Sequence, residues 1–140
     1  MITGAIGDGI VLVGRVSLVL LFLIFGWRKL RDYPGTVSQM VADRLPMPSV
    51  VAAVAIVMEL PVAFAVGVGA FTRPLALLMA LYTLGTSMAE HRYWTKPRGG
   101  RLAALEDFYK NLGIMGGFLL LSVTGGGAYS VDALWRLAAR

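Results

Sequence analysis

The sequence contains no cysteine and only one histidine, His91. Without cysteine, the chain cannot form disulfides, carry out thiol–disulfide chemistry, or bind iron–sulfur clusters or zinc through thiolates. One histidine is too few to hold a haem between two imidazoles within a single copy. We therefore predict that the chain has no metal site and no built-in cofactor.

Charged residues are also scarce, at 15% of the 140 residues, whereas hydrophobic residues make up 57%. Soluble domains usually reach about 45–50% even when glycine is counted as apolar. A small soluble protein needs polar groups to cover its large surface, and this chain has too few of them. The net charge of +5 would suggest nucleic-acid binding in a soluble protein, but the basic residues lie between apolar runs. The composition therefore predicts an integral membrane protein whose partner is the lipid bilayer and not nucleic acid.

Four apolar segments approach the roughly 20 residues that an α-helix needs to span a bilayer. The predicted helices cover residues 9–30, 48–70, 74–92 and 105–123. Arg15 interrupts the first segment, and Glu59 is the only charged residue inside the second. We therefore predict an all-α fold, an integral membrane four-helix bundle, formed by residues 1–140 as a single domain.

The distribution of lysine and arginine predicts the orientation of this bundle. Most of these residues lie in or beside the loops that follow the first and third helices. Basic loops remain in the cytoplasm according to the positive-inside rule. We therefore predict a protein of the plasma (inner) membrane, with the basic loops in the cytoplasm and the N and C termini outside.

Glu59 is the most informative residue, because a charge at the middle of a span costs about 2.5–3.5 kcal/mol on insertion scales. Ala55, Glu59, Ala63 and Gly67 are spaced four apart, so they share one helix face, and we expect Glu59 to point into the bundle. Arg15 lies at a similar height on the antiparallel first helix, so we expect it to pair with Glu59. Two interpretations remain open: Glu59 is a proton-active or ligand-orienting carboxylate, or the pair only fixes helix register.

A second polar group is predicted at the cytoplasmic ends of the helices. Lys29 closes the first helix, His91 closes the third and Asn111 opens the fourth. His91 can relay a proton near neutral pH, or it is simply an interfacial residue. Lys29 and Asn111 can bind a ligand, or they serve topology and helix packing. The candidate catalytic residues are therefore Glu59 and His91, and the candidate ligand-binding residues are Arg15, Lys29, Glu59, His91 and Asn111.

Several stretches together resemble the DoxX family of small membrane proteins. They are Gly14 to Leu30, Met58-Glu59-Leu60, Val68 to Leu77, Asn111 to Gly117 and Gly127 to Asp132, and the resemblance covers nearly the whole chain. Each stretch is only moderately specific, but their order and spacing together favour the family.

The resemblance implies four membrane helices and a role as a membrane subunit in redox systems, since relatives are linked to thiosulfate:quinone oxidoreduction and to oxidative-stress complexes. Arg15, Lys29, Glu59 and Arg73 match polar positions that recur in the family. No chemical role comes with these positions. The family resemblance adds a redox partner protein to the expected partners, and a homo-oligomer is also open.

Two functions follow from the residues and the resemblance. The first is a redox-associated membrane subunit that binds a quinone or similar amphiphile, because no side chain here can carry electrons itself. Glu59 or His91 would handle protons, and Arg15 or Lys29 would orient the head group. The alternative is a non-enzymatic membrane scaffold or assembly factor that recruits a soluble partner through the basic cytoplasmic loops, especially Lys96 to Arg101. The residues leave open whether the protein is an enzyme.

Overall fold

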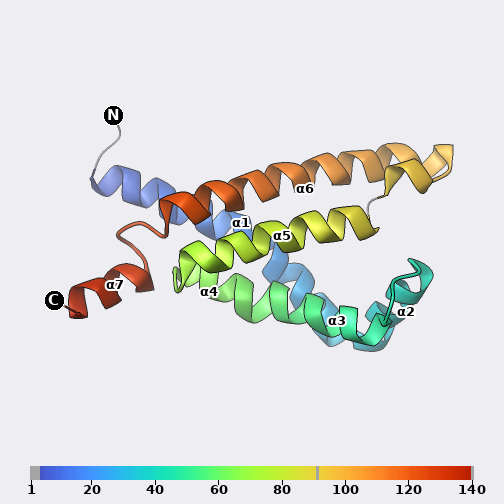
Figure 1. The fold of residues 1–140 in the computed structure, drawn as a ribbon, viewed down its shortest axis with the longest axis horizontal. Helices are drawn as coiled ribbons and strands as arrows, with labels where there is room; N and C mark the ends of the chain where they lie inside the picture. The colour runs from blue at the N-terminus through green and yellow to red at the C-terminus, as the bar shows by residue number, and fades with distance from the viewer. Residues whose placement is uncertain (1–3, 91, 140) are drawn as a thin grey trace.

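The computed structural model describes residues 4–90 and 92–139, and all the regular secondary structure of this part of the chain is helical, with no strand. Most of it forms four long helices, whose arrangement is drawn in Figure 1. They are α1 (Ala5–Arg31), a second helix built from α3 (Pro48–Val57), η1 (Met58–Val62) and α4 (Ala63–Val68), α5 (Thr72–Glu90) and α6 (Arg98–Thr124). The shorter elements are α2 (Tyr33–Ala42), the 3₁₀ turn η2 (Tyr93–Thr95) and α7 (Val131–Ala138).

Local sequence explains where these helices begin and end. The Asp32 side chain accepts a hydrogen bond of 3.0 Å from the Gly35 backbone N–H at the start of α2, and Ser130 accepts one of 3.2 Å from Ala133 at the start of α7. Both are N-caps, which satisfy the free N–H groups of a first turn. α4 ends at Gly69, whose φ of 78° lies in the left-handed region that glycine tolerates.

The second long helix contains a π-helical turn, η1, around Pro61. Proline has no backbone N–H, so it cannot donate to the carbonyl four residues earlier in an α-helix. A single wider turn accommodates this gap, and such turns are frequent at functional sites. Glu59 lies inside this turn.

The bundle presents apolar side chains outward and holds several polar ones inside. Leu81, Leu120 and Val123 are largely exposed, whereas Arg15 and Glu59 are buried. The buried apolar core lies between the helices and includes Val19, Phe22, Ala63, Met79 and Phe118. An exterior this apolar is suited to lipid rather than to water, so the all-helical membrane fold predicted from composition is confirmed.

Two of the helices, Ala5–Arg31 and Pro48–Val68, are long and apolar enough to cross a membrane by length and composition alone. α5 and α6 lie side by side along the bundle (Figure 1). That these two also cross the bilayer remains a prediction. The helix expected from residue 105 begins earlier, at Arg98, and the short helices α2 and α7 were not predicted.

The helix ends gather at two ends of the bundle (Figure 1). The beginning of α1, the turn between α4 and α5, and α7 lie at one end, which we call the α7 end. α2 and the beginning of α6 lie at the other, the α2 end. The basic segments after the first and third long helices therefore share one end of the molecule. Which end faces the cytoplasm remains a prediction.

Candidate functional site

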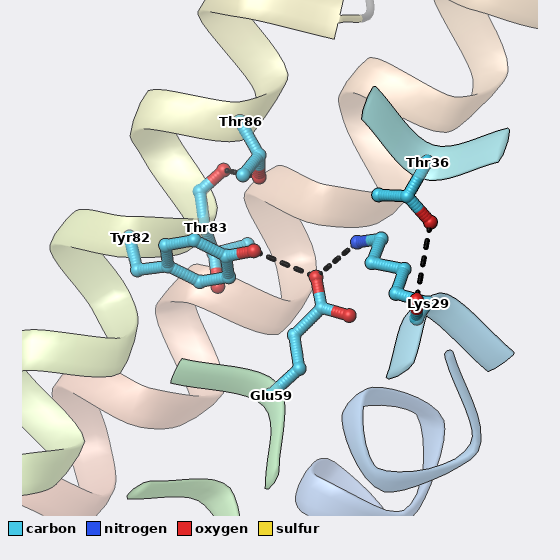
Figure 2. Close-up of polar contacts among 6 residues, drawn as sticks. All are labelled: Lys29, Thr36, Glu59, Tyr82, Thr83 and Thr86. Carbon is cyan, nitrogen blue, oxygen red and sulfur yellow. Dashed lines mark hydrogen bonds and ion pairs between the residues drawn. The ribbon is translucent and has the colours of Figure 1, made fainter. Parts of the chain in front are cut away.

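Glu59 lies at the centre of a buried polar cluster, with only 4% of its surface exposed. Its Oε1 atom accepts a hydrogen bond from the Lys29 ammonium and a second, of 2.6 Å, from the Tyr82 hydroxyl. Lys29 comes from α1, Glu59 from η1 and Tyr82 from α5, so the cluster joins three of the four long helices (Figure 2). The expectation that Glu59 points into the bundle is confirmed.

Close packing of α1 against η1 brings the ion pair together. A Cβ atom added to Gly26 would lie 2.7 Å from the Glu59 Cβ atom, so only glycine allows this approach. Lys29 follows Gly26 by three residues, which places both on the same face of α1. The Lys29 side chain is 22% exposed, whereas that of Glu59 is 6% exposed. The pair therefore reaches from the bundle interior toward an open space.

The second carboxylate oxygen of Glu59 is in a different position. Oε2 is buried and has no hydrogen-bond partner among the residues that the structure describes. A carboxylate oxygen is a strong acceptor, and buried polar atoms of this kind are normally paired. Glu59 thus has one saturated oxygen and one that can still accept a hydrogen bond.

A cleft of about 1200 Å³ opens beside this cluster. Its apolar wall comes mainly from α1 and α6 and includes Leu18, Phe22, Phe25 and Ile114. Its polar lining comes from all the surrounding helices and includes Lys29, Thr36, Gln39, Glu59, Tyr82, Thr86, Glu90, Asp107, Lys110 and Asn111. The cleft therefore combines a long apolar wall with a small, deep polar cluster and a charged mouth.

Arg15 does not take part in this site, so the predicted Arg15–Glu59 pair is wrong. The guanidinium donates to the backbone carbonyls of Gly67 at 3.0 Å, Tyr129 at 2.7 Å, and Gly126. It is 1% exposed and joins α1, α4 and the segment between α6 and α7. Within the part of the chain that the structure describes, Arg15 therefore holds these segments together at the α7 end.

The error has a physical cause. The predicted pairing assumed that α3 begins level with the end of α1, but the connection between them contains α2. α2 packs on α3, with the Tyr33 hydroxyl donating to the Ser49 carbonyl at 2.8 Å, so the first turns of α3 lie beyond the end of α1. Glu59 is therefore level with Gly26. Arg15 precedes Gly26 by eleven residues, or about 16 Å along the helix.

A second polar network surrounds Asp132 at the α7 end. Its two carboxylate oxygens accept hydrogen bonds from the backbone N–H groups of Phe71, at 2.7 Å, and Thr72, at 2.8 Å. Asp132 thereby caps the start of α5 from a distant part of the chain. Burial acts to raise the pKa of Asp132, but the hydrogen bonds from Thr72 and Phe71 and the charge of Arg136 outweigh it, so the pKa is lowered.

The other predicted site residues have separate outcomes. Lys29, Glu59 and Asn111 all line the one cleft, as their candidate role requires. Arg15 is not among the cleft residues. His91, the second candidate for proton transfer, lies outside the described residues. The cleft thus brings together three of the five candidates.

Tyr82 is a member of the Glu59 cluster that the sequence analysis missed. Its ring lies beside Phe22, with centroids 6.4 Å apart, and its hydroxyl reaches Glu59. The sequence did contain an indication of a polar surface on this helix, because two polar pairs, at 82–83 and 86–87, lie one turn apart in an otherwise apolar segment. Thr83, Thr86 and Ser87 all donate to carbonyls of their own helix, and only Tyr82 and Thr86 of these four residues line the cleft.

The fold and the cleft define an all-helical membrane protein with a buried ion pair beside an open polar cleft. Residues 10–92 match the family named DoxX, so the chain belongs to that family and the resemblance read from the sequence is confirmed.

Two curated relatives support the assignment over most of the chain. The inner membrane protein YphA of Escherichia coli is 43% identical over 129 residues, which cover 92% of each chain. The inner membrane protein YqjF of the same bacterium is 38% identical over 124 residues, covering 89% of this chain and 90% of the relative. No solved structure matches the chain. The similarity therefore extends well beyond the matched family segment, into α6.

Proposed function

We propose that this DoxX-family protein is a redox-associated subunit of the inner membrane that binds a quinone or similar amphiphile in the cleft. The observation that carries the proposal is a buried carboxylate, Glu59, held by Lys29 and Tyr82 in a cleft that has an apolar wall. Ionisable groups inside a membrane domain are costly, and they are usually retained for function.

The dimensions and lining of the cleft fit such a ligand. Its volume of about 1200 Å³ is above the roughly 300–1,000 Å³ of ordinary small-molecule sites, so it has room for a ring and a tail. Leu18, Phe22, Phe25 and Ile114 offer apolar contact for a ring and tail, while Glu59 and its partners offer hydrogen bonds to a head group. A bound quinone would supply the electron chemistry, and the chain would bind and orient it.

The proposed orientation follows the basic residues. The α2 end carries the basic segments around Arg28 and Lys96, so it faces the cytoplasm, and the α7 end with both termini faces outward. The charged mouth of the cleft includes Arg31, Asp32 and Lys110, so it would lie near the cytoplasmic head groups. A soluble or membrane-bound redox partner would then exchange electrons with the ligand from that side.

Native mass spectrometry of the protein, extracted from its own membrane in a mild detergent, tests the proposal. We expect a bound mass that matches a quinone. The variant Gly113→Leu should lose this mass. Gly113 lines the cleft, and an added side chain meets no protein atom there, so the leucine would occupy space that the ligand needs. Gly116→Leu is a matched control on the same helix, since Gly116 is not among the cleft residues and its position is also open. Absence of any bound small molecule from the wild-type protein would contradict the proposal.

A scaffold that recruits a soluble partner is the second candidate. It is favoured by the run from Lys96 to Arg101, in which Lys96, Arg98 and Arg101 are all exposed. A protein that co-purifies without any bound small molecule would support this function. Under it, neutralising Arg98 and Arg101 should abolish recruitment, whereas quinone binding in the cleft would be untouched by that change.

A further inference from the structure

The unpaired oxygen of Glu59 indicates that a ligand in the cleft should carry a hydrogen-bond donor. Oε1 already accepts from Lys29 and Tyr82, whereas Oε2 is buried with no partner among residues 4–90 and 92–139. Glu59 forms an ion pair with Lys29, so its oxygens are acceptors and cannot donate. Glu59 lines the cleft, so a ligand that displaces the atoms covering Oε2 can supply the missing donor.

The walls of the cleft limit the rest of the ligand. Phe22 and Phe25 of α1 and Ile114 of α6 favour a flat, apolar head. A head group that carries only carbonyl oxygens could accept a hydrogen bond from another group in the cleft, but it would leave Oε2 without a donor. A hydroxyl group on the same head would instead donate its hydrogen to Oε2.

Lys29 offers hydrogen-bond donors that a ligand hydroxyl group can accept from. An ammonium has three N–H donors, and one of them is used by Glu59. Lys29 also lines the cleft and keeps 22% of its side chain exposed, so its other donors are accessible. A ligand hydroxyl could therefore donate to Oε2 of Glu59 and accept from Lys29 at once.

We propose that the cleft selects the hydroxyl-bearing, reduced form of its amphiphile over the carbonyl-bearing, oxidised form, and that Oε2 of Glu59 is the atom that discriminates between them. The inference rests on the proposed function, because it assumes that a quinone-like molecule enters the cleft. It adds the redox form that is held and the atom that recognises it. Glu59 acts here as a specificity-determining residue.

Three matched probes test the selectivity: a decyl-substituted benzoquinone, its hydroquinone, and the dimethyl ether of that hydroquinone. Binding is measured anaerobically by calorimetry on the full-length protein in lipid nanodiscs, with empty nanodiscs as the background. We expect the hydroquinone to bind about 10- to 100-fold more tightly than the quinone, the range expected for a hydrogen bond to a charged acceptor. The dimethyl ether should bind as weakly as the quinone, because it has the same ring but no donor.

The variant Glu59→Gln sharpens the test. Its carboxamide oxygen can still accept from Lys29 and Tyr82, and its NH₂ group then takes the place of Oε2 as a donor. The preference should therefore invert toward the quinone. Gly116→Leu, outside the cleft, should retain the wild-type order.

The outcomes separate this inference from the proposed function. If none of the three probes binds the wild-type protein, both the quinone site and its selectivity are overturned. If the quinone binds as tightly as the hydroquinone, the cleft is a quinone site but the role of Oε2 is overturned, as expected if water is its partner. The wild-type comparison decides this even if Glu59→Gln does not fold.

Discussion

A charged residue in the middle of an apolar helix is stable only if its surroundings satisfy it. In this protein Glu59 obtains a cation from Lys29 and a hydroxyl from Tyr82, and both act on the same oxygen. The ion pair sits at the cleft wall rather than in the sealed core. This position puts the pair beside any ligand in the cleft, and it also lowers the cost of desolvating the two charges.

Removing one member of this pair should be costly. Lys29→Met leaves the Glu59 charge buried without its cation, and we expect a loss of about 3 kcal/mol in the free energy of unfolding. The double variant Lys29→Met with Glu59→Met should recover most of that loss, since neither charge is then left unpaired. Reversible unfolding in mixed detergent micelles gives the free energy of unfolding of the wild-type protein, the single variant and the double variant.

A double-mutant cycle of the same kind distinguishes Lys29, the observed partner of Glu59, from Arg15, the partner predicted from the sequence. Arg15→Met should destabilise the protein through its own three carbonyl contacts, and adding Glu59→Met should not restore stability. The effects of Arg15→Met and Glu59→Met should add, because the two sites share no partner. A strong coupling between Arg15 and Glu59 would show that the pairing described here is wrong.

At the scale of elements, the site depends on how closely α1 approaches η1. The π turn around Pro61 carries Glu59, and Gly26 lets the two backbones come together there. Neither α1 nor the second long helix would hold the carboxylate in place alone. The position of Glu59 beside Lys29 therefore depends on the contact between α1 and η1.

A glycine pair within α1 tests this contact. Gly26→Ala would place a Cβ 2.7 Å from that of Glu59, so we expect a loss of about 1–3 kcal/mol from overpacking. Gly14→Ala is the matched control, because an added Cβ there meets nothing within 4 Å. It should be neutral or stabilising by up to about 1 kcal/mol through helix propensity. Equal effects of the two changes on unfolding would contradict the close approach at Gly26.

The short helix α7 is tied to α5 through Asp132, and this contact should depend on pH. The pKa of Asp132 is lowered from its ordinary value of 3.8 because hydrogen bonds from Thr72 and Phe71 and the Arg136 charge outweigh burial. A carboxyl whose pKa is lower in the folded state stabilises the fold fully above its unfolded pKa. That stabilisation is lost as the pH falls through the lower folded pKa.

Asp132→Asn should therefore lower the thermal midpoint at pH 7, and the difference from wild type should shrink as the pH is reduced below 4. Melting curves of both proteins between pH 7 and pH 3, in the same detergent, give this difference. A constant difference across that range would show that ionisation of Asp132 does not contribute.

At the scale of the whole molecule, apolar run length and composition predicted the all-helical membrane fold, and the isolated charge at Glu59 indicated the centre of the buried polar cluster. The partner of Glu59 could not be predicted, because helix register depends on the packing of α2 against α3. Tyr82 was missed because a tyrosine in an apolar helix is more often a core or interfacial residue. Both failures concern contacts between distant segments, which local periodicity does not encode.

The orientation of the whole bundle can be tested because the chain has no cysteine. Single cysteines introduced at Ser38, in α2, and at Ala139, just after α7, are both exposed and lie at opposite ends of the bundle. In Escherichia coli spheroplasts, a membrane-impermeant maleimide should label Ala139→Cys at once, and Ser38→Cys only after the membrane is permeabilised. The positive-inside rule requires this order, because the basic segments share the α2 end. The reverse order would place the cleft mouth on the outer side, and the redox partner would then have to be sought there.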